Sequence, residues 1–253
     1  MKDYSFRIGE ENINNYYNKM KVIDIVDSKN VIVEFVDFNY TKKVTYYNFK
    51  KGLVGSPFDR TICGIGYIGV GKYKPYENGK QPLAYRRWVS MLRRCYDPKT
   101  QKKRPRYEGC KVCEKWHCYQ NFAEWFYKHY YTLDDQNICL DKDILVKNNK
   151  IYSPETCAFV PNDINVLFEK SNKIRGEYPI GVSYNKEKDK FESFIKYYGK
   201  KKFLGYYETP EDAFLAYKRF KEKYIKELAD KYKFYISEEI YRAMYNYEVE
   251  IDD

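Results

Sequence analysis

The sequence predicts an α+β fold, and three observations along its 253 residues support this. Short runs of β-branched and aromatic residues come first, between about residues 20 and 47. The middle carries apolar positions at helical spacing, and the last third combines three short β-type runs with a well-capped helix. The expected units are a small β module (1–60), a glycine-rich connector (61–81), a central unit with flanking helices (82–170), an antiparallel sheet with a helix (171–235) and a tail (236–253).

The N-terminal module is predicted to form three short strands, at residues 20–26, 31–36 and 44–47. Turn-forming residues lie between them, at 27–30 and 37–39. The glycine-rich stretch 63–75 is expected to be a connector or an extended arm. Its glycines do not match a phosphate-binding loop, because no strand-to-helix junction follows them.

A helix is predicted from Pro82 to Cys95, and its two sides differ in character. One side carries an apolar stripe at 3.6-residue spacing, formed by Ala84, Trp88, Met91, Leu92 and Cys95. The other side is basic. A second helix is expected near residues 121–131.

Positive charge is concentrated in one window of a chain whose net charge is +10. Residues 84–109 carry nine basic and two acidic side chains, a local charge of +7. Such clustering favours contact with a phosphate backbone, although a solvated helix face followed by a polar loop would give the same pattern. The basic residues are Arg86, Arg87, Arg93, Arg94, Lys99, Lys102, Lys103, Arg104 and Arg106.

Composition indicates a globular protein with aromatic cores, since the chain contains 30 Tyr, 15 Phe and 3 Trp. No apolar run approaches the roughly 20 residues that a membrane-spanning helix needs, and the first residues lack a signal peptide, so we expect a cytoplasmic protein without a membrane partner. The seven cysteines are interpreted as buried apolar residues or metal ligands. Cys110 and Cys113 are followed closely by His117 and Cys118. A convincing zinc site would need a second ligand pair at recognisable spacing, so the sequence argues against zinc.

Five blocks in the middle of the chain carry a family resemblance: residues 85–96, 112–116, 121–122, 140–145 and 152–161. In this order and at these gaps they resemble the HNH homing endonucleases of phages and bacteria, over about a third of the chain. The resemblance implies a β-hairpin from Ile138 to Pro161 and a helix from Asn162 to Lys170, which together hold one divalent metal, Mg²⁺ or Mn²⁺.

The same resemblance assigns roles to particular residues. Asp141 matches the metal-binding carboxylate, Lys142 stands where the family has its general-base histidine, and Thr156 stands where an asparagine ligates the metal. Asp143 is a substitute ligand or base, and Asn162 or Asn165 fills the last position of the motif. With two of three key positions altered, catalysis and its loss both remain open; in the second case Lys142 would bind a phosphate.

Residues 178–233 resemble the apetala-two, or ethylene-response-factor, DNA-binding domain, through Gly181–Val182, Phe191–Ile195, Phe203–Tyr207 and Thr209–Tyr217. Local chemistry agrees, because Thr209 is a good N-cap and Pro210 suits a first helical turn. The family places the exposed sheet face in the DNA major groove. The matching positions here are Ser183, Phe194, Lys196, Lys201 and Phe203, although an ordinary packing module with solvent-facing lysines is the alternative.

Together these observations predict a protein that binds double-stranded DNA and no small molecule, in the host cytoplasm if a phage encodes it. It is either a metal-dependent DNA endonuclease or a non-catalytic DNA-binding protein that retains the nuclease fold. A zinc-stabilised scaffold for RNA or protein is a third class. The tail after Ile236 forms a short helix from Ser237 or stays loose.

Overall fold

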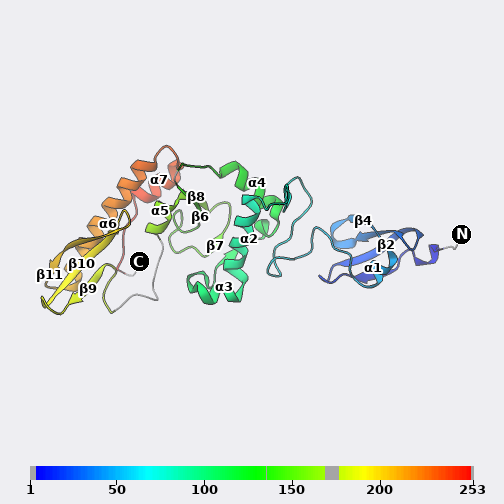
Figure 1. The fold of residues 1–253 in the computed structure, drawn as a ribbon, viewed down its shortest axis with the longest axis horizontal. Coiled ribbons are helices and arrows are strands. Elements are labelled where there is room, and N and C mark those ends of the chain that lie inside the picture. Colours follow the sequence, from blue (N-terminus) through cyan, green and yellow to red (C-terminus); the bar gives the residue numbers. More distant parts are fainter. Residues whose placement is uncertain (1–3, 135, 169–176, 252–253) are drawn as a thin grey trace. The chain divides into compact units, whose positions relative to one another are not determined.

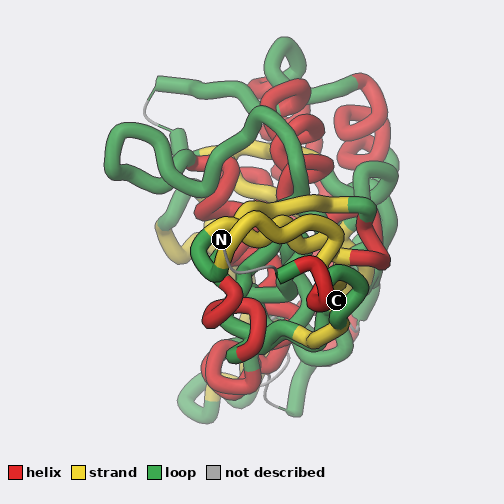
Figure 2. The backbone as a smooth tube through the Cα atoms, turned by 90° about the vertical axis from the view of Figure 1, so that its right-hand side faces the viewer, coloured by secondary structure: helices red, strands yellow, loops and turns green. Residues whose placement is uncertain are grey.

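The computed structural model describes residues 4–134, 136–168 and 177–251, and it confirms an α+β fold. The chain forms two compact units. Figures 1 and 2 show the helices and strands along its trace. Residues 1–102 and 112–127 make up the first unit, whereas residues 103–111 and 128–253 make up the second. The segment with the predicted nuclease resemblance, 82–170, is therefore shared between both units.

The first unit begins with a four-stranded antiparallel sheet in the order β1-β2-β3-β4. Its inner face buries a core that includes Met20, Val33 and Phe35, with Phe49 from the following helix. The elements are η1 (Ser5–Arg7), β1 (Glu11–Ile13), β2 (Lys19–Asp27), β3 (Asn30–Phe35), η2 (Val36–Phe38), β4 (Tyr40–Val44) and α1 (Tyr46–Lys50).

The predicted third strand, 44–47, is wrong in position. The last strand of the sheet begins four residues earlier, after Asn39 takes a left-handed conformation with φ of 49°. Thr45 then caps a helix, its Oγ1 accepting a hydrogen bond from the Asn48 backbone N–H at 3.2 Å. This cap turns the chain out of the sheet, so local β-propensity does not decide the conformation of Tyr46 and Tyr47.

The glycine-rich stretch after the sheet forms no helix or long strand, but it is packed rather than a free arm. A Cβ atom at Gly66 would clash with Leu92 and Trp88, and one at Gly71 would clash with Gln120. The predicted helices follow, and the apolar stripe around Trp88 is fully buried. The elements are α2 (Leu83–Tyr96), α3 (Pro98–Lys103), η4 (Glu114–His117) and α4 (Tyr119–His129).

In the second unit, the predicted hairpin strands and the helix after them are present. Ile138 pairs with Pro161 and Asp141 with Ala158, in antiparallel register. The predicted helix ends at Leu167, and its expected last residues, 169–170, lie outside the described residues. The elements are η3 (Pro105–Tyr107), β5 (Lys111–Val112), β6 (Ile138–Asp141), β7 (Ile151–Tyr152), β8 (Ala158–Pro161) and α5 (Asn162–Leu167).

The C-terminal sheet has the three antiparallel strands that the sequence predicts, in the order β11-β10-β9. They are β9 (Val182–Asn185), β10 (Lys190–Tyr197) and β11 (Lys200–Tyr207), and α6 (Pro210–Tyr232) lies along one face of the sheet (Figure 1). Thr209 caps this helix as expected, with Oγ1 accepting from the Asp212 N–H at 3.2 Å. Tyr217, Tyr224 and Leu228 of α6 are buried.

One hydrophobic core joins the hairpin to the C-terminal sheet. Val160 and Ile164, from β8 and α5, belong to the same buried cluster as Val182, Ile195 and Leu228. The expected unit boundary, between residues 170 and 171, lies outside the described residues. The tail also packs: α7 (Glu238–Tyr245) is capped by Ser237, and Met244 and Val249 are buried in this cluster.

Candidate functional site

Asp141, the predicted metal ligand, ends strand β6 and is only 8% exposed. Its Oδ1 accepts hydrogen bonds from the backbone N–H groups of Asp143 and Ile144, both at 2.8 Å. Burial, together with the neighbouring Asp143 carboxylate, raises the pKa of Asp141 to about 6. The carboxylate therefore shapes the turn that follows the strand.

Lys142, which stands in the general-base position, is buried in an ion pair. Its Nζ donates to Oδ1 and Oδ2 of Asp143 at 2.6 and 2.7 Å, and to the Asn149 carbonyl at 2.7 Å. The Lys142 side chain is 8% exposed and that of Asp143 is 36% exposed. An ammonium group has three N–H donors, and all three have partners within the protein. No donor is left over for a phosphate.

Asn149, which the sequence analysis missed, completes this arrangement. Its Nδ2 donates to the carbonyls of Lys142 and Ile151 at 2.8 and 2.6 Å, and its Oδ1 accepts from the Ile151 N–H at 3.0 Å. The residue therefore ties the turn after β6 to the start of β7. It lies between the motif blocks 140–145 and 152–161, in a stretch where the resemblance assigns no role.

The other two predicted metal ligands are Thr156 and Asn165. Thr156 Oγ1 donates to the Ile151 carbonyl at 2.8 Å and lies 3.1 Å from Ser153 Oγ. Asn165 lies in α5, where its carbonyl accepts from the Phe168 N–H at 3.3 Å. Within residues 4–134, 136–168 and 177–251, no group of three or more His, Cys, Asp or Glu side chains is placed to hold a metal ion.

These residues do not fit a catalytic Mg²⁺ or Mn²⁺. Such an ion is bound through one or two protein carboxylates together with water, and the motif implied by the resemblance needs a second protein ligand beside Asp141. Here both oxygens of Asp143 face the Lys142 ammonium, so this second carboxylate is not free for a metal cation. The two carboxylates are used to hold the hairpin turn.

The sheet of β9, β10 and β11 presents its second face away from α6. Side chains alternate along a strand, and Val182 and Ile195 are buried against the helix, so their sequence neighbours point outward. We call this surface the outer face. Cross-strand pairing places Ser183, Asn185, Glu192, Phe194, Lys196, Lys201, Phe203 and Tyr206 on it.

All five DNA-contact positions predicted in this sheet therefore lie on the outer face. Lys196 is directly opposite Lys201, and Phe194 is directly opposite Phe203. The Lys201 ammonium lies 3.8 Å from the centroid of the Phe194 ring, a cation–π contact. Phe203 is 52% exposed and Tyr206 is 43% exposed, with ring centroids 4.8 Å apart.

The Ser183 hydroxyl, on strand β9 of the outer face, forms a hydrogen bond within the protein. It donates to Glu192 Oε1 at 2.8 Å, and Asn185 Nδ2 lies 3.4 Å from Glu192 Oε2. The hydrogen bond from Ser183 lowers the pKa of Glu192. Glu192 is therefore held as a carboxylate on the outer face, opposite Ser183 of β9 and Tyr206 of β11, whereas the Lys196–Lys201 pair lies further along β10 and β11.

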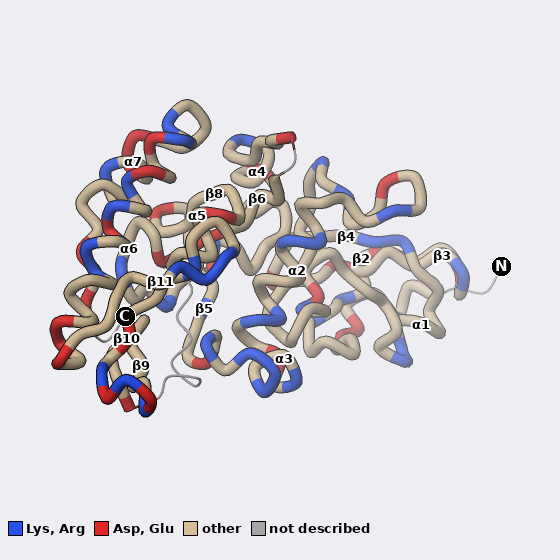
Figure 3. Tube along the Cα trace, turned by 60° about the vertical axis from the view of Figure 1, so that its left-hand side comes forward, with Lys and Arg blue, Asp and Glu red and all other residues tan. Residues whose placement is uncertain are grey.

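The basic window of residues 84–109 is divided between the two units. In the first unit, Arg86, Arg93 and Lys102 are exposed, Arg87 and Arg94 are half-buried, and Arg94 Nε donates to the Ser90 carbonyl at 3.3 Å. In the second unit, Lys103, Arg104 and Arg106 are exposed. Figure 3 shows Lys and Arg gathered on the trace around α3.

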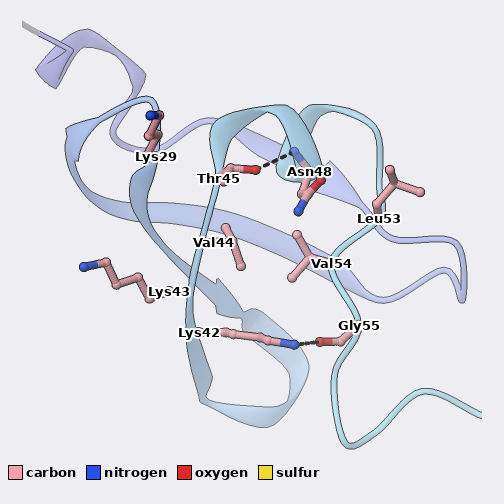
Figure 4. A pocket seen from close by; sticks show the side chains of 9 residues that line it. All are labelled: Lys29, Lys42, Lys43, Val44, Thr45, Asn48, Leu53, Val54 and Gly55. Atoms are coloured by element: carbon pink, nitrogen blue, oxygen red, sulfur yellow. Dashed lines mark hydrogen bonds between the residues drawn. The ribbon is translucent and has the colours of Figure 1, made fainter.

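A further basic surface, which the sequence analysis missed, lies in the N-terminal sheet. A shallow hollow of about 350 Å³ is lined by Lys29, Lys42 and Lys43, with Thr45 and Asn48 beside them (Figure 4). Lys42 Nζ donates a hydrogen bond to the Gly55 carbonyl at 2.7 Å. The lysines come from a β-turn and from edge strand β4, where lysine is common whatever the function.

Comparisons with protein-family models, with curated proteins and with solved structures found no match to this chain. No helix in the described part of the chain is both long and apolar enough to cross a membrane. The chemistry of the outer face and of the Asp141 turn is therefore the basis for assigning a function.

Proposed function

We propose that this chain is a non-catalytic DNA-binding protein that contacts duplex DNA through the outer face. The observation that carries the proposal is the pairing of Lys196 and Lys201 on a solvent-facing sheet, next to exposed Phe203. Neither lysine forms an ion pair within the described residues, so both ammonium groups are available to phosphates. A sheet of this size is suited to a DNA groove.

The exposed basic residues of the 84–109 window support the same function. Lys102, Lys103 and Arg104 are exposed, as is Arg93 on α2. Positive charges of this kind attract the DNA backbone without reading sequence, and they make affinity depend steeply on salt. They add to binding by the outer face wherever they reach the same DNA.

The endonuclease alternative is less well supported by the geometry. Hydrolysis of a phosphodiester needs a group that accepts a proton from water and positive charge that faces the phosphate. Lys142 directs its three N–H groups to Asp143 and Asn149, so it supplies neither. A regulatory or architectural role fits a protein that binds DNA and leaves it intact.

The binding test compares two double variants of the full chain on a fluorescently labelled duplex. Lys196→Ala with Lys201→Ala is expected to weaken binding at least tenfold and to reduce the slope of log affinity against log salt by about 2, one unit for each lost phosphate contact. Lys226→Ala with Lys233→Ala, a matched loss of two exposed charges at α6 that form no ion pair within the described residues, should leave affinity and slope nearly unchanged. Equal effects of both pairs, or no duplex binding by the wild type, would overturn the proposal.

The cleavage test incubates supercoiled plasmid with the wild type and Asp141→Ala, in Mg²⁺ and in Mn²⁺. We expect no nicking by either protein. Nicking by the wild type that disappears in Asp141→Ala would instead establish the endonuclease.

A further inference from the structure

Two neighbouring aromatic rings on the outer face have no packing role that explains their exposure. Phe203 and Tyr206 are among the exposed large side chains, at 52% and 43%, and their ring centroids are 4.8 Å apart. Exposed apolar rings in contact with each other commonly mark a binding surface. The nearby Phe194 ring differs, because the Lys201 ammonium already covers it.

A β-bulge brings the two rings to the same face. Residues three apart in a regular strand point to opposite faces, so Phe203 and Tyr206 would normally be separated by the sheet. The register between β10 and β11 shifts between Ser193 and Phe194: Ser193 pairs with Gly205, and Phe194 pairs with Phe203. The extra residue, Leu204, restores Tyr206 to the outer face.

The bulge is held by specific features of the chain. Gly205 has φ of 143°, a backbone conformation that side chains with a Cβ rarely adopt, and Tyr207 donates its hydroxyl proton to the Leu204 carbonyl at 3.2 Å. Bulges are frequent where a strand must redirect a side chain at a functional site. Here the result is a pair of outward rings: Phe203 lies two residues along β11 from Lys201, and Tyr206 lies opposite Glu192.

Aromatic faces and duplex DNA are poorly matched, because base pairs in a perfect duplex expose their edges and hide their faces. Unpaired bases expose their faces, and stacking on aromatic side chains contributes roughly 1–3 kcal/mol per base. Lysines beside such rings bind the backbone of the same strand. This combination is present at the β10–β11 side of the outer face.

We infer that Phe203 and Tyr206 stack on unpaired bases, so that this protein binds DNA containing an unpaired segment more tightly than a perfect duplex of the same sequence. The inference rests on the proposed function, since it uses the same face and the same lysines. It adds the structural state of the DNA that the face prefers.

The test measures binding of the full chain to three labelled probes of one sequence: the perfect duplex, the duplex with a central unpaired bubble, and the single strand. The bubble is expected to bind about tenfold more tightly than the duplex, which is the effect of one stacked base. Phe203→Leu and Tyr206→Leu keep apolar bulk but remove the ring. Each should abolish most of this preference, so that the ratio of bubble affinity to duplex affinity falls toward one.

Three controls separate the possible results. Phe234→Leu removes a ring that is 91% exposed and lies outside the sheet, and it should leave the preference intact. Lys196→Ala should weaken binding to all three probes by a similar factor. A 2-aminopurine base placed in the bubble should lose fluorescence on stacking with the wild type and keep it with Phe203→Leu.

Failure of the inference and failure of the proposed function give different outcomes. Equal binding to all three probes that neither Phe203→Leu nor Tyr206→Leu alters would overturn the inference and leave DNA binding in place. Absence of binding to every probe would overturn both.

Discussion

The turn after β6 and the outer face both combine lysine with acidic or aromatic side chains, yet they use these groups in opposite ways. At the turn, Lys142 is buried and bonded to Asp143 and Asn149. On the outer face, Lys196 is exposed and Lys201 covers only an aromatic ring. A lysine whose donors are satisfied inside the protein stabilises a loop, whereas one directed to water remains available to a polyanion.

The largest expected effect follows from breaking the buried ion pair. Lys142→Met removes the partner of the Asp143 carboxylate and of the Asn149 carbonyl. We expect the free energy of unfolding to fall by roughly 3 kcal/mol. This value is at the lower end of the losses measured for broken buried ion pairs, because Asp143 is partly solvated. Urea unfolding at neutral pH measures it. In the matched variant, Lys190→Met, the pair with Glu208 is exposed, with a lysine side chain 43% accessible, and the loss should stay below about 1 kcal/mol.

Similar losses in both lysine variants would show that the Lys142 pair is not a structural element. A metal-dependent change in the wild-type unfolding curve on addition of EDTA would also contradict our interpretation, because it would require an ion at this turn.

The second prediction uses the raised pKa of Asp141. A folded-state pKa of about 6 against an ordinary value of 3.8 means that the folded protein binds this proton more strongly. The stability that this bound proton contributes is therefore fully present below about pH 4 and is lost as the pH rises through about 6. The total loss in the free energy of unfolding is roughly 2–3 kcal/mol. Asp141→Asn keeps an oxygen acceptor for the Asp143 and Ile144 N–H groups but cannot ionise.

The measurement is urea unfolding of both proteins at about pH 4 and about pH 8. The stability of Asp141→Asn relative to the wild type should increase by roughly 2–3 kcal/mol from the lower to the higher pH. A difference that does not vary with pH would mean that Asp141 titrates normally and that its burial has no electrostatic cost.

Local sequence signals predicted the elements of the second unit well. The Thr209 cap and Pro210 each act within a few residues, and the structure places both as expected. The family resemblance gave Lys196 and Lys201 as positions on the exposed sheet face, and cross-strand pairing places both on the outer face. The tail helix from Ser237 was left open by the sequence, because its stability depends on burying Ile240 and Met244 against distant residues.

Side-chain roles at the predicted nuclease centre could not be obtained in the same way. The sequence places Asp141, Lys142 and Thr156 at motif positions, but it does not show that Lys142 finds a partner seven residues away in Asn149. The bulge at Leu204 and Gly205 was also missed, because a one-residue shift in register depends on the neighbouring strand. Tyr206 was absent from the predicted DNA-contact set, which followed the positions of the family resemblance.

The third prediction removes the bulge geometry from the outer face. Gly205→Ala adds a Cβ at φ of 143°, within 2.9 Å of the Tyr207 hydroxyl, so the strand must shift. We expect a loss of about 1–2 kcal/mol in stability and loss of the preference for bubble DNA, because Tyr206 moves away from Phe203. Unfolding and probe binding are measured on the same preparation.

Gly199→Ala is the matched control, since Gly199 also has positive φ, 79°, but has no atom near its Cβ position. It should lose stability and retain the preference. If Gly205→Ala kept the preference while losing stability, ring alignment would not be the function of the bulge.

The smallest expected effect concerns Glu192, a carboxylate on the outer face. Glu192→Gln removes the charge that Ser183 and Asn185 hold there, and its amide oxygen can still accept from Ser183. Less repulsion of phosphates should strengthen binding to all three DNA probes by about two- to threefold at low salt, and the gain should shrink as salt screens the charge. Glu211→Gln, on the exposed first turn of α6, makes the same change in net charge outside the sheet. Because only Glu192 lies on the outer face, an equal gain from both substitutions would show that DNA responds to the charge of the whole protein and not to this face.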